Sequence, residues 1–201
     1  MTFRILIIAT ALVAAAARVT LGQSLHEARR WYDAGEYQRV VDAEGGTTDP
    51  RVLYLVAQSQ QKLRRPDEAR GTYEQLAARP DADPWRAVGR SAIALLSSNA
   101  AGAVQEADQA VARGGSIAEA HYQRGLALSA RQEMAEAAAA FQKASDLDPS
   151  WSYAHYYAGI AFSKVRRADL TASHFQTFLK LAPQAPERGE VQSILRTLGR
   201  H

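Results

Sequence analysis

The stretch AEAHYQRGLALSARQEMAEAAAAFQKASDLDP, residues 118–149, decides the fold, because SYAHYYAGIAFSKVRRADLTASHFQTFLKLAP, residues 152–183, superposes on it without a gap. The two segments begin 34 residues apart, and like residues recur at that spacing. A fixed period of this length indicates a repeat architecture in which one structural unit is used several times. The recurring pairs are His121 with His155, Tyr122 with Tyr156, Gly125 with Gly159, Ala127 with Ala161, Phe141 with Phe175, Leu147 with Leu181 and Pro149 with Pro183.

Each of the two segments has the pattern of a helix pair. Alanine is abundant, β-branched residues are sparse, and no alternating run typical of a strand is found. Gly125 and Gly159 lack a Cβ atom, so a neighbouring helix can approach them closely, and Phe141 and Phe175 stand in the second helix where they can fill the adjoining volume. The proline that ends each segment cannot continue the preceding helix. The pattern therefore predicts an all-α stack of antiparallel helix hairpins.

The repeated segments resemble the tetratricopeptide repeat family, whose unit is a 34-residue antiparallel helix pair with small residues where the helices touch and a closing proline. The second copy departs from the family at Thr171 and Phe178, where alanine is favoured, so we expect its helices to lie slightly further apart. The resemblance implies an α-solenoid that binds a protein or peptide and needs no cofactor. The matching residues are Gly125, Leu128, Ala137, Phe141, Ala144 and Pro149 in the first copy and Gly159, Phe162, Phe175 and Pro183 in the second.

The same phase continues toward the N-terminus with weaker matches. Ala107 lies 34 residues before Phe141, and Tyr73 lies 34 residues before Ala107. In the earliest unit the run Glu44-Gly45-Gly46 shortens the second helix, and such departures are expected in a terminal repeat. We therefore predict one solenoid domain over residues 23–201, with units at 24–49, 50–83, 84–115, 116–149 and 150–183 and a capping helix over 186–199.

Residues 1–22 have the pattern of a signal peptide. Arg4 precedes an uncharged apolar run of 13 residues, Ile5 to Ala17, and Arg18 ends that run. The run is shorter than the roughly 20 residues that a membrane span needs. We expect cleavage after Gly22, or alternatively after Ala17, and an uncleaved anchor or a buried first helix are the other interpretations. The protein is thus expected to be exported, periplasmic or secreted, and membrane-anchored only if the segment is retained.

The composition restricts the kinds of partner. Hydrophobic residues make up 47% of the 201-residue chain, which is enough for a folded core. The net charge is only +3, from 24 basic and 21 acidic residues, and the basic residues are scattered among the acids. A nucleic-acid binder needs a clustered basic face, so nucleic acid is not the expected partner. The chain has no cysteine, which excludes disulfides, thiolate metal sites and a cysteine nucleophile.

The first helix of each hairpin carries a second apolar stripe that the hairpin itself does not need. Stacked hairpins form a superhelix whose concave wall is lined by these first helices. We expect an exposed, aromatic wall there that suits an extended or helical peptide, with packing between adjacent repeats as the alternative for each residue. The predicted partner-binding residues are Tyr54, Trp85, Val88, Tyr122, Leu126, Tyr153, Tyr156 and Ile160.

The sequence has no recognisable pattern of catalysis or metal binding. His121 and His155 occupy equivalent places in different hairpins, which favours packing over joint metal ligation. There is no GxSxG elbow, P-loop or dinucleotide fingerprint, so no catalytic, cofactor-binding or metal-binding residue is predicted. The sequence thus predicts a non-enzymatic scaffold that binds a protein partner on its concave face. Self-association through that face is the first alternative, and an enzyme with an unrecognised site is the second.

Overall fold

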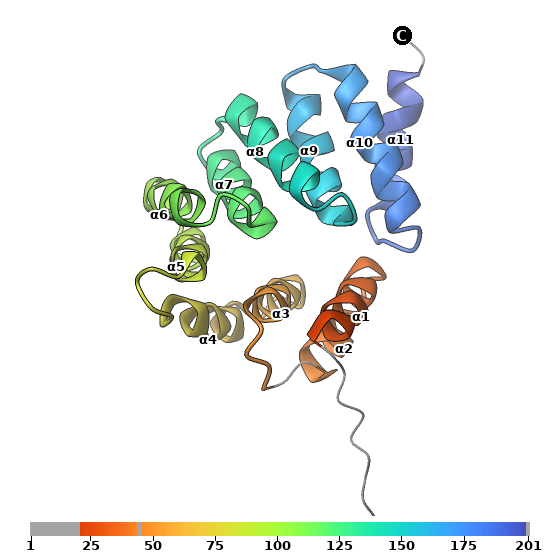
Figure 1. Cartoon of the computed structure of the whole chain (residues 1–201). Helices are drawn as coiled ribbons and strands as arrows, with labels where there is room; N and C mark the ends of the chain where they lie inside the picture. Colours follow the sequence, from red (N-terminus) through yellow and green to blue (C-terminus); the bar gives the residue numbers. More distant parts are fainter. Residues whose placement is uncertain (1–20, 44–45, 200–201) are drawn as a thin grey trace, which may run out of the picture.

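The computed structural model describes residues 21–43 and 46–199, and within these ranges it is helical, with no strand (Figure 1). Consecutive helices pack against one another as antiparallel hairpins, which confirms the predicted all-α solenoid. The helices are α1 (Leu21–Asp33), α2 (Tyr37–Ala43), α3 (Pro50–Lys62), α4 (Pro66–Ala77), α5 (Pro84–Leu96), α6 (Ala100–Arg113), α7 (Ala118–Ala130), α8 (Met134–Leu147), α9 (Ser152–Lys164), α10 (Ala168–Leu181) and α11 (Arg188–Leu198).

Local sequence signals set the helix ends. Asp49 and Asp83 cap α3 and α5, each accepting a hydrogen bond from the backbone N–H two residues later, and a proline follows each of them at the first helical position. In the four hairpins from α3–α4 to α9–α10, the turn contains one non-glycine residue with a positive φ of 57° to 67°. These residues are 34 positions apart, so the repeat fixes the turn geometry as well as the helices. They are Arg64, Ser98, Gln132 and Arg166.

The hairpins α7–α8 and α9–α10 close on glycine–phenylalanine contacts, as the repeat predicts. A Cβ atom built at Gly125 would lie 2.6 Å from a ring carbon of Phe141, and one at Gly159 would lie 2.5 Å from the ring of Phe175. Both rings are buried. The absence of a side chain at these glycines therefore sets how closely the two helices of α7–α8 and of α9–α10 approach each other.

The stack winds round until its two ends meet (Figure 1). The ring of Tyr32 in α1 lies 4.8 Å, centroid to centroid, from the ring of Tyr153 in α9. Lys62, the last residue of α3, forms a 2.8 Å ion pair with Glu187, which precedes α11. The inner helices therefore surround a narrow axis, and α1 lies beside the far end of the chain.

The two ends of the solenoid differ from the repeats between them. Helix α2 has only seven residues and ends before the predicted interruption at 44–46, whereas the second helices of the later hairpins have 12 to 14. Helix α11 buries Val191 and follows the last hairpin, where the capping helix was expected. The predicted signal segment lies outside the described residues, except that α1 begins at Leu21. Within the described ranges, no helix is long and apolar enough to cross a membrane.

Candidate functional site

The concave wall predicted from the sequence is largely buried, so the expected exposure is wrong for five of its eight residues. Each of the five is at most 7% exposed, although all lie on the first helices as expected. The superhelix is wound so tightly that side chains from opposite helices meet across its axis. The five buried residues are Tyr54, Trp85, Val88, Tyr122 and Tyr153.

Aromatic rings fill this axis. The ring of Tyr54 in α3 lies 6.4 Å from that of Tyr122 in α7, two hairpins further along the chain. Tyr122 also lies 4.4 Å from Trp151 and 5.6 Å from Tyr157. Because such ring pairs contribute beyond their buried area, the contacts hold non-adjacent repeats together. We call this set the axial cluster: Tyr32, Tyr54, Tyr122, Trp151, Tyr153 and Tyr157.

A buried polar chain accompanies the axial cluster. The Tyr54 hydroxyl donates a 2.7 Å hydrogen bond to Oε1 of Gln123, and Nε2 of Gln123 donates to Oγ of Ser91 at 3.1 Å. The Ser91 hydroxyl donates in turn to the backbone oxygen of Ala103. All three side chains are buried, so each needs its partners within the protein. The chain links α3, α7, α5 and α6.

The other three predicted wall residues are half-buried. Leu126 lies beside a smaller hollow of about 360 Å³ at the end of the axis near the C-termini of the inner helices. Tyr156 packs against Phe178 of α10, at 5.1 Å between ring centroids, and Ile160 also contacts the core. No partner is present to test any of the eight, so partner contact at Leu126, Tyr156 and Ile160 stays a prediction.

At the opposite end of the axis the inner helices begin, and a cavity of about 650 Å³ opens there. We call it the mouth cavity. It contains apolar side chains and both signs of charge, a combination that suits recognition of a segment carrying both apolar and charged groups. Its lining residues are Leu25, Arg29, Thr48, Asp49, Pro50, Arg51, Trp85, Ser116, Ile117, Ala118, Glu119, Leu147 and Asp148.

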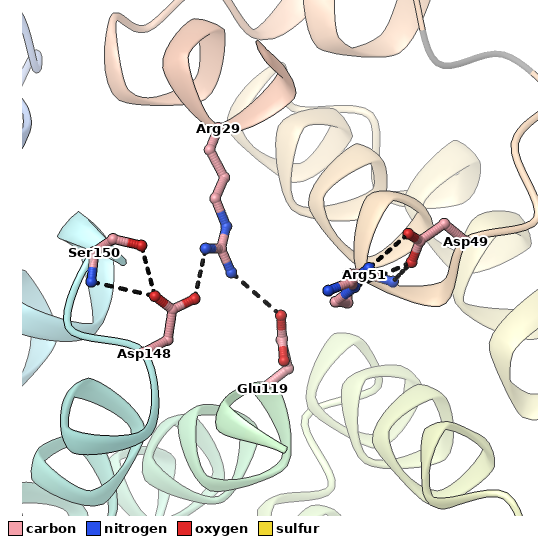
Figure 2. Close-up of polar contacts among 6 residues, drawn as sticks. All are labelled: Arg29, Asp49, Arg51, Glu119, Asp148 and Ser150. Carbon is pink, nitrogen blue, oxygen red and sulfur yellow. Dashed lines mark hydrogen bonds and ion pairs between the residues drawn. The ribbon is translucent and has the colours of Figure 1, made fainter. Parts of the chain in front are cut away.

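Arg29 of α1 reaches across the mouth cavity to the later repeats (Figure 2). Its guanidinium donates to Oδ2 of Asp148 at 2.5 Å and to Oε1 of Glu119 at 3.4 Å. The guanidinium carbon also lies 5.3 Å from the ring centroid of Trp151, within the range of a cation–π contact. One guanidinium therefore joins the first helix to the start of α7 and to the loop before α9.

The two carboxylates around Arg29 differ in their surroundings. Burial raises the pKa of Glu119, and this outweighs the opposing effects of its own backbone N–H and of Arg29. Burial also acts on Asp148, but the Ser150 hydroxyl and the Arg29 charge prevail and lower the pKa of Asp148. The second oxygen of Asp148 accepts from both the hydroxyl and the backbone N–H of Ser150, which fixes its orientation (Figure 2).

A second arginine lines the other side of the mouth cavity. Nη2 and Nε of Arg51 donate to the Asp49 carboxylate at 3.1 and 3.4 Å, so the residue that caps α3 also orients this arginine. The Arg51 side chain remains 46% exposed, whereas the Asp49 side chain is 4% exposed. Arg51 is therefore the cation of the mouth cavity that is most open to solvent, since the Arg29 side chain is 18% exposed.

Nothing in the repeat pattern marks Arg29, Trp151 or Asp148 as functional residues. Arg29 lies in α1, whereas Asp148 and Trp151 share the loop between α8 and α9, so the two segments are distant in sequence and meet only because the superhelix closes. Glu119 lies three residues before Tyr122, on the same face of α7, but the repeat pattern does not predict that Arg29 lies opposite it. The contacts of Arg29 with Glu119 and Asp148 depend on how the whole superhelix is wound, and the sequence of one hairpin does not define that winding.

Three histidines, His121, His155 and His174, form contacts within the protein. Nδ1 of His155 lies 3.0 Å from Nδ1 of His174, whose Nε2 lies 2.7 Å from Oε1 of Gln142, and His121 contacts the backbone oxygen of Gly115. Among residues 21–43 and 46–199, no group of three or more histidine or acidic side chains is placed to hold a metal ion.

Comparisons with known proteins agree with the fold. Tetratricopeptide repeat models match residues 51–82 and 118–151. A tetratricopeptide-repeat protein of Thermus thermophilus is 20% identical, with a TM-score of 0.62 over 87% of this chain and 98% of that one. The TPR2AB domain of yeast Sti1, solved as a complex with pHSP90, is 14% identical, with a TM-score of 0.53 over 90% of this chain and 86% of that one. At these identities the likeness shows the fold alone, and no curated protein sequence matches the chain.

Proposed function

Because this chain belongs to the tetratricopeptide-repeat family, we propose that it is a non-enzymatic scaffold that binds a segment of another protein at the mouth of its superhelix. The observation that supports this proposal is the mouth cavity. Its volume of about 650 Å³ falls in the range of roughly 300–1,000 Å³ that is usual for ligand sites. It provides room for a few side chains of a partner segment.

The chemistry of the mouth cavity favours a protein segment over other ligands. Leu25, Ile117 and Leu147 supply apolar contact, while Arg51 presents a half-exposed guanidinium beside them. The carboxylates of Asp49, Glu119 and Asp148 balance the two arginines, which argues against a polyanion such as nucleic acid. The expected concave-face contacts at Leu126, Tyr156 and Ile160 become a second, weaker candidate region under this proposal.

The test fills the mouth cavity without disturbing the core. Ser116 is exposed and lines the cavity, so Ser116→Trp places a large ring in the binding volume, and Ser173→Trp on exposed α10 is the matched variant. Each form serves as bait in affinity purification from the native host. We expect the partner to be recovered with the unaltered chain and with Ser173→Trp, and at least tenfold less with Ser116→Trp. Equal recovery by both variants contradicts a site in the mouth cavity.

Self-association is distinguished in the same experiment. If the bait recovers only its own chain and light scattering gives a mass that rises with concentration, the scaffold joins copies of itself instead of a different protein. A concentration-independent monomer excludes an obligate self-assembly.

We further propose that the scaffold works outside the cytoplasm. The support is the short apolar run between Arg4 and Arg18 and the small residues after it. Mass spectrometry of protein recovered from its host is expected to show loss of the first 22 residues, or of 17. Recovery of the intact chain from the cytoplasm contradicts export.

A further inference from the structure

Three side chains surround the Arg29 guanidinium in the way that a binding site surrounds a ligand. Asp148 accepts one hydrogen bond at 2.5 Å, Glu119 accepts a second at 3.4 Å, and the Trp151 ring lies 5.3 Å away. A guanidinium is planar, presents its N–H donors as a fork and stacks on aromatic rings, so it uses two carboxylates and an indole in a way that an ammonium cannot. Ser150 holds Asp148 in place, so the acceptors are oriented independently of Arg29 (Figure 2).

Arg29 belongs to α1, which buries Leu25, Ala28 and Tyr32 against the rest of the protein. Besides Arg29, α1 reaches the later repeats through a 2.5 Å hydrogen bond from the Ser152 hydroxyl to Asp33 and through the Tyr32–Tyr153 ring contact. Arg29, Tyr32 and Asp33 lie on one face of α1, at positions i, i+3 and i+4. The ion pairs of Arg29 and the hydrogen bond of Asp33 are polar contacts, which a segment carrying the same groups can replace.

Open space next to the guanidinium gives an incoming group access. The mouth cavity borders Arg29, Glu119 and Asp148 on the solvent side. A partner that enters the cavity therefore meets the two carboxylates before it meets the axial cluster.

We propose that Glu119, Asp148 and Trp151 form an arginine receptor, which Arg29 occupies within the chain and which an arginine on a helix of the partner protein occupies in the complex. The proposal rests on the proposed scaffold function and names the chemistry of its partner. The partner helix carries arginine followed by tyrosine three residues later and aspartate four residues later, because these are the groups that the C-terminal repeats accept from α1. Binding of that helix displaces α1 and opens the ring.

The probe is a fluorescein-labelled synthetic peptide with the sequence of residues 21–36, and anisotropy measures its binding to the full chain. In the unaltered chain Arg29 competes, so binding is weak. Arg29→Met keeps the apolar stem and removes the guanidinium, and this variant is expected to bind the peptide at least tenfold more tightly. A peptide carrying Arg29→Gln is expected to bind at least tenfold more weakly than the parent peptide, whereas one carrying Arg30→Gln, which changes an exposed neighbour, binds like the parent.

A test variant and a matched control variant examine the carboxylates that accept the arginine. In the Arg29→Met chain, Asp148→Asn is expected to abolish the preference for the arginine peptide, and Glu136→Gln, on exposed surface of α8, is expected to retain it. Equal affinity for the arginine and glutamine peptides, or binding of neither, overturns the proposal. Arg29→Met chains that ignore the peptide and instead pair with one another by light scattering overturn it in favour of a second copy as the occupant.

If Arg29→Met fails to fold, a chain that retains Arg29 still decides the question. The chain has no cysteine, so Glu27→Cys on α1 and Lys143→Cys on α8 accept a donor and acceptor dye, and both positions are exposed. Saturating arginine peptide is expected to lower energy transfer as α1 leaves, and unchanged transfer overturns the proposal. If energy transfer is unchanged but Ser116→Trp loses the natural partner, the arginine receptor is disproved and the mouth cavity remains the binding site. If Ser116→Trp retains the natural partner, the mouth cavity itself is disproved as the binding site.

Discussion

The Tyr54 hydroxyl and the Gln123 side-chain oxygen are joined by a 2.7 Å hydrogen bond although 69 residues separate them. Both side chains are buried, and Gln123 passes the connection on to Ser91. This hydrogen bond forms only if the superhelix brings α3 and α7 together, so removing it tests how closely the repeats are wound. Tyr54→Phe leaves the buried oxygen of Gln123 without its donor, which is expected to lower the free energy of unfolding by about 1–3 kcal/mol.

Urea unfolding of Tyr54→Phe, Gln123→Leu and the double variant measures the coupling between the two residues. Each single change strands one buried polar group, whereas the double change removes both, so the double variant is expected to lose less than the sum of the single losses. Strict additivity contradicts direct contact across the axis.

The glycine–phenylalanine contacts predict a second stability effect. Gly125→Leu inserts a side chain where even a Cβ atom would lie 2.6 Å from the Phe141 ring, and Gly159→Leu does the same against Phe175. Each is expected to destabilise the protein by about 1–3 kcal/mol or more. Thermal unfolding measures the loss. The matched change is Gly71→Ala in α4, where the new methyl group meets nothing within 4 Å and helix propensity favours alanine by up to about 1 kcal/mol. Unchanged stability in both leucine variants contradicts the packing.

These glycine contacts show what one repeat predicts well. The 34-residue period placed Gly125 opposite Phe141 because both residues belong to one hairpin, whose geometry is local. The same reasoning placed Tyr122 on an open wall, and there it was wrong. Whether a first-helix residue is exposed depends on the small rotation between successive hairpins, which accumulates over the stack. That rotation brings Tyr54 to Tyr122 and α1 to α9, and no single repeat contains it.

The mouth cavity was missed for the same reason. Arg29 belongs to the unit that matches the repeat least well, and its partners Glu119 and Asp148 lie at the two ends of the unit at 116–149. The sequence predicts a binding surface on the inner helices, but the charged cavity at the start of these helices forms only when the superhelix closes.

The His174 imidazole gives a pH-dependent prediction. Burial, with the nearby His155 as the second cause, lowers the pKa of His174 from 6.5 to about 4. A proton therefore binds the unfolded chain more readily than the folded one, and acidification through the window from about 6.5 down to about 4 lowers the free energy of unfolding. Between roughly pH 7.5 and 5, we expect the unaltered chain to lose on the order of 1 kcal/mol more than His174→Gln.

Thermal unfolding of both forms at several pH values checks the His174 prediction. His155 remains in the variant, and its pKa is also lowered by burial, so part of the pH dependence is expected to persist. Parallel curves for the two forms show that His174 is protonated equally in the folded and unfolded states, contrary to its surroundings in the structure.

Tyr122 and Leu126 lie one turn apart on α7, but Tyr122 is buried and Leu126 is half-buried. Tyr122 is 1% exposed and contacts the rings of Tyr54, Trp151 and Tyr157, so Tyr122→Ala leaves a large void and is expected to cost about 3–5 kcal/mol. Leu126 borders the smaller hollow, so Leu126→Ala removes fewer contacts and is expected to cost less than half as much. Urea unfolding compares the two variants. If Tyr122→Ala changes the stability no more than Leu126→Ala does, the axis is more open than described, and Tyr122 returns as a partner contact on the concave face.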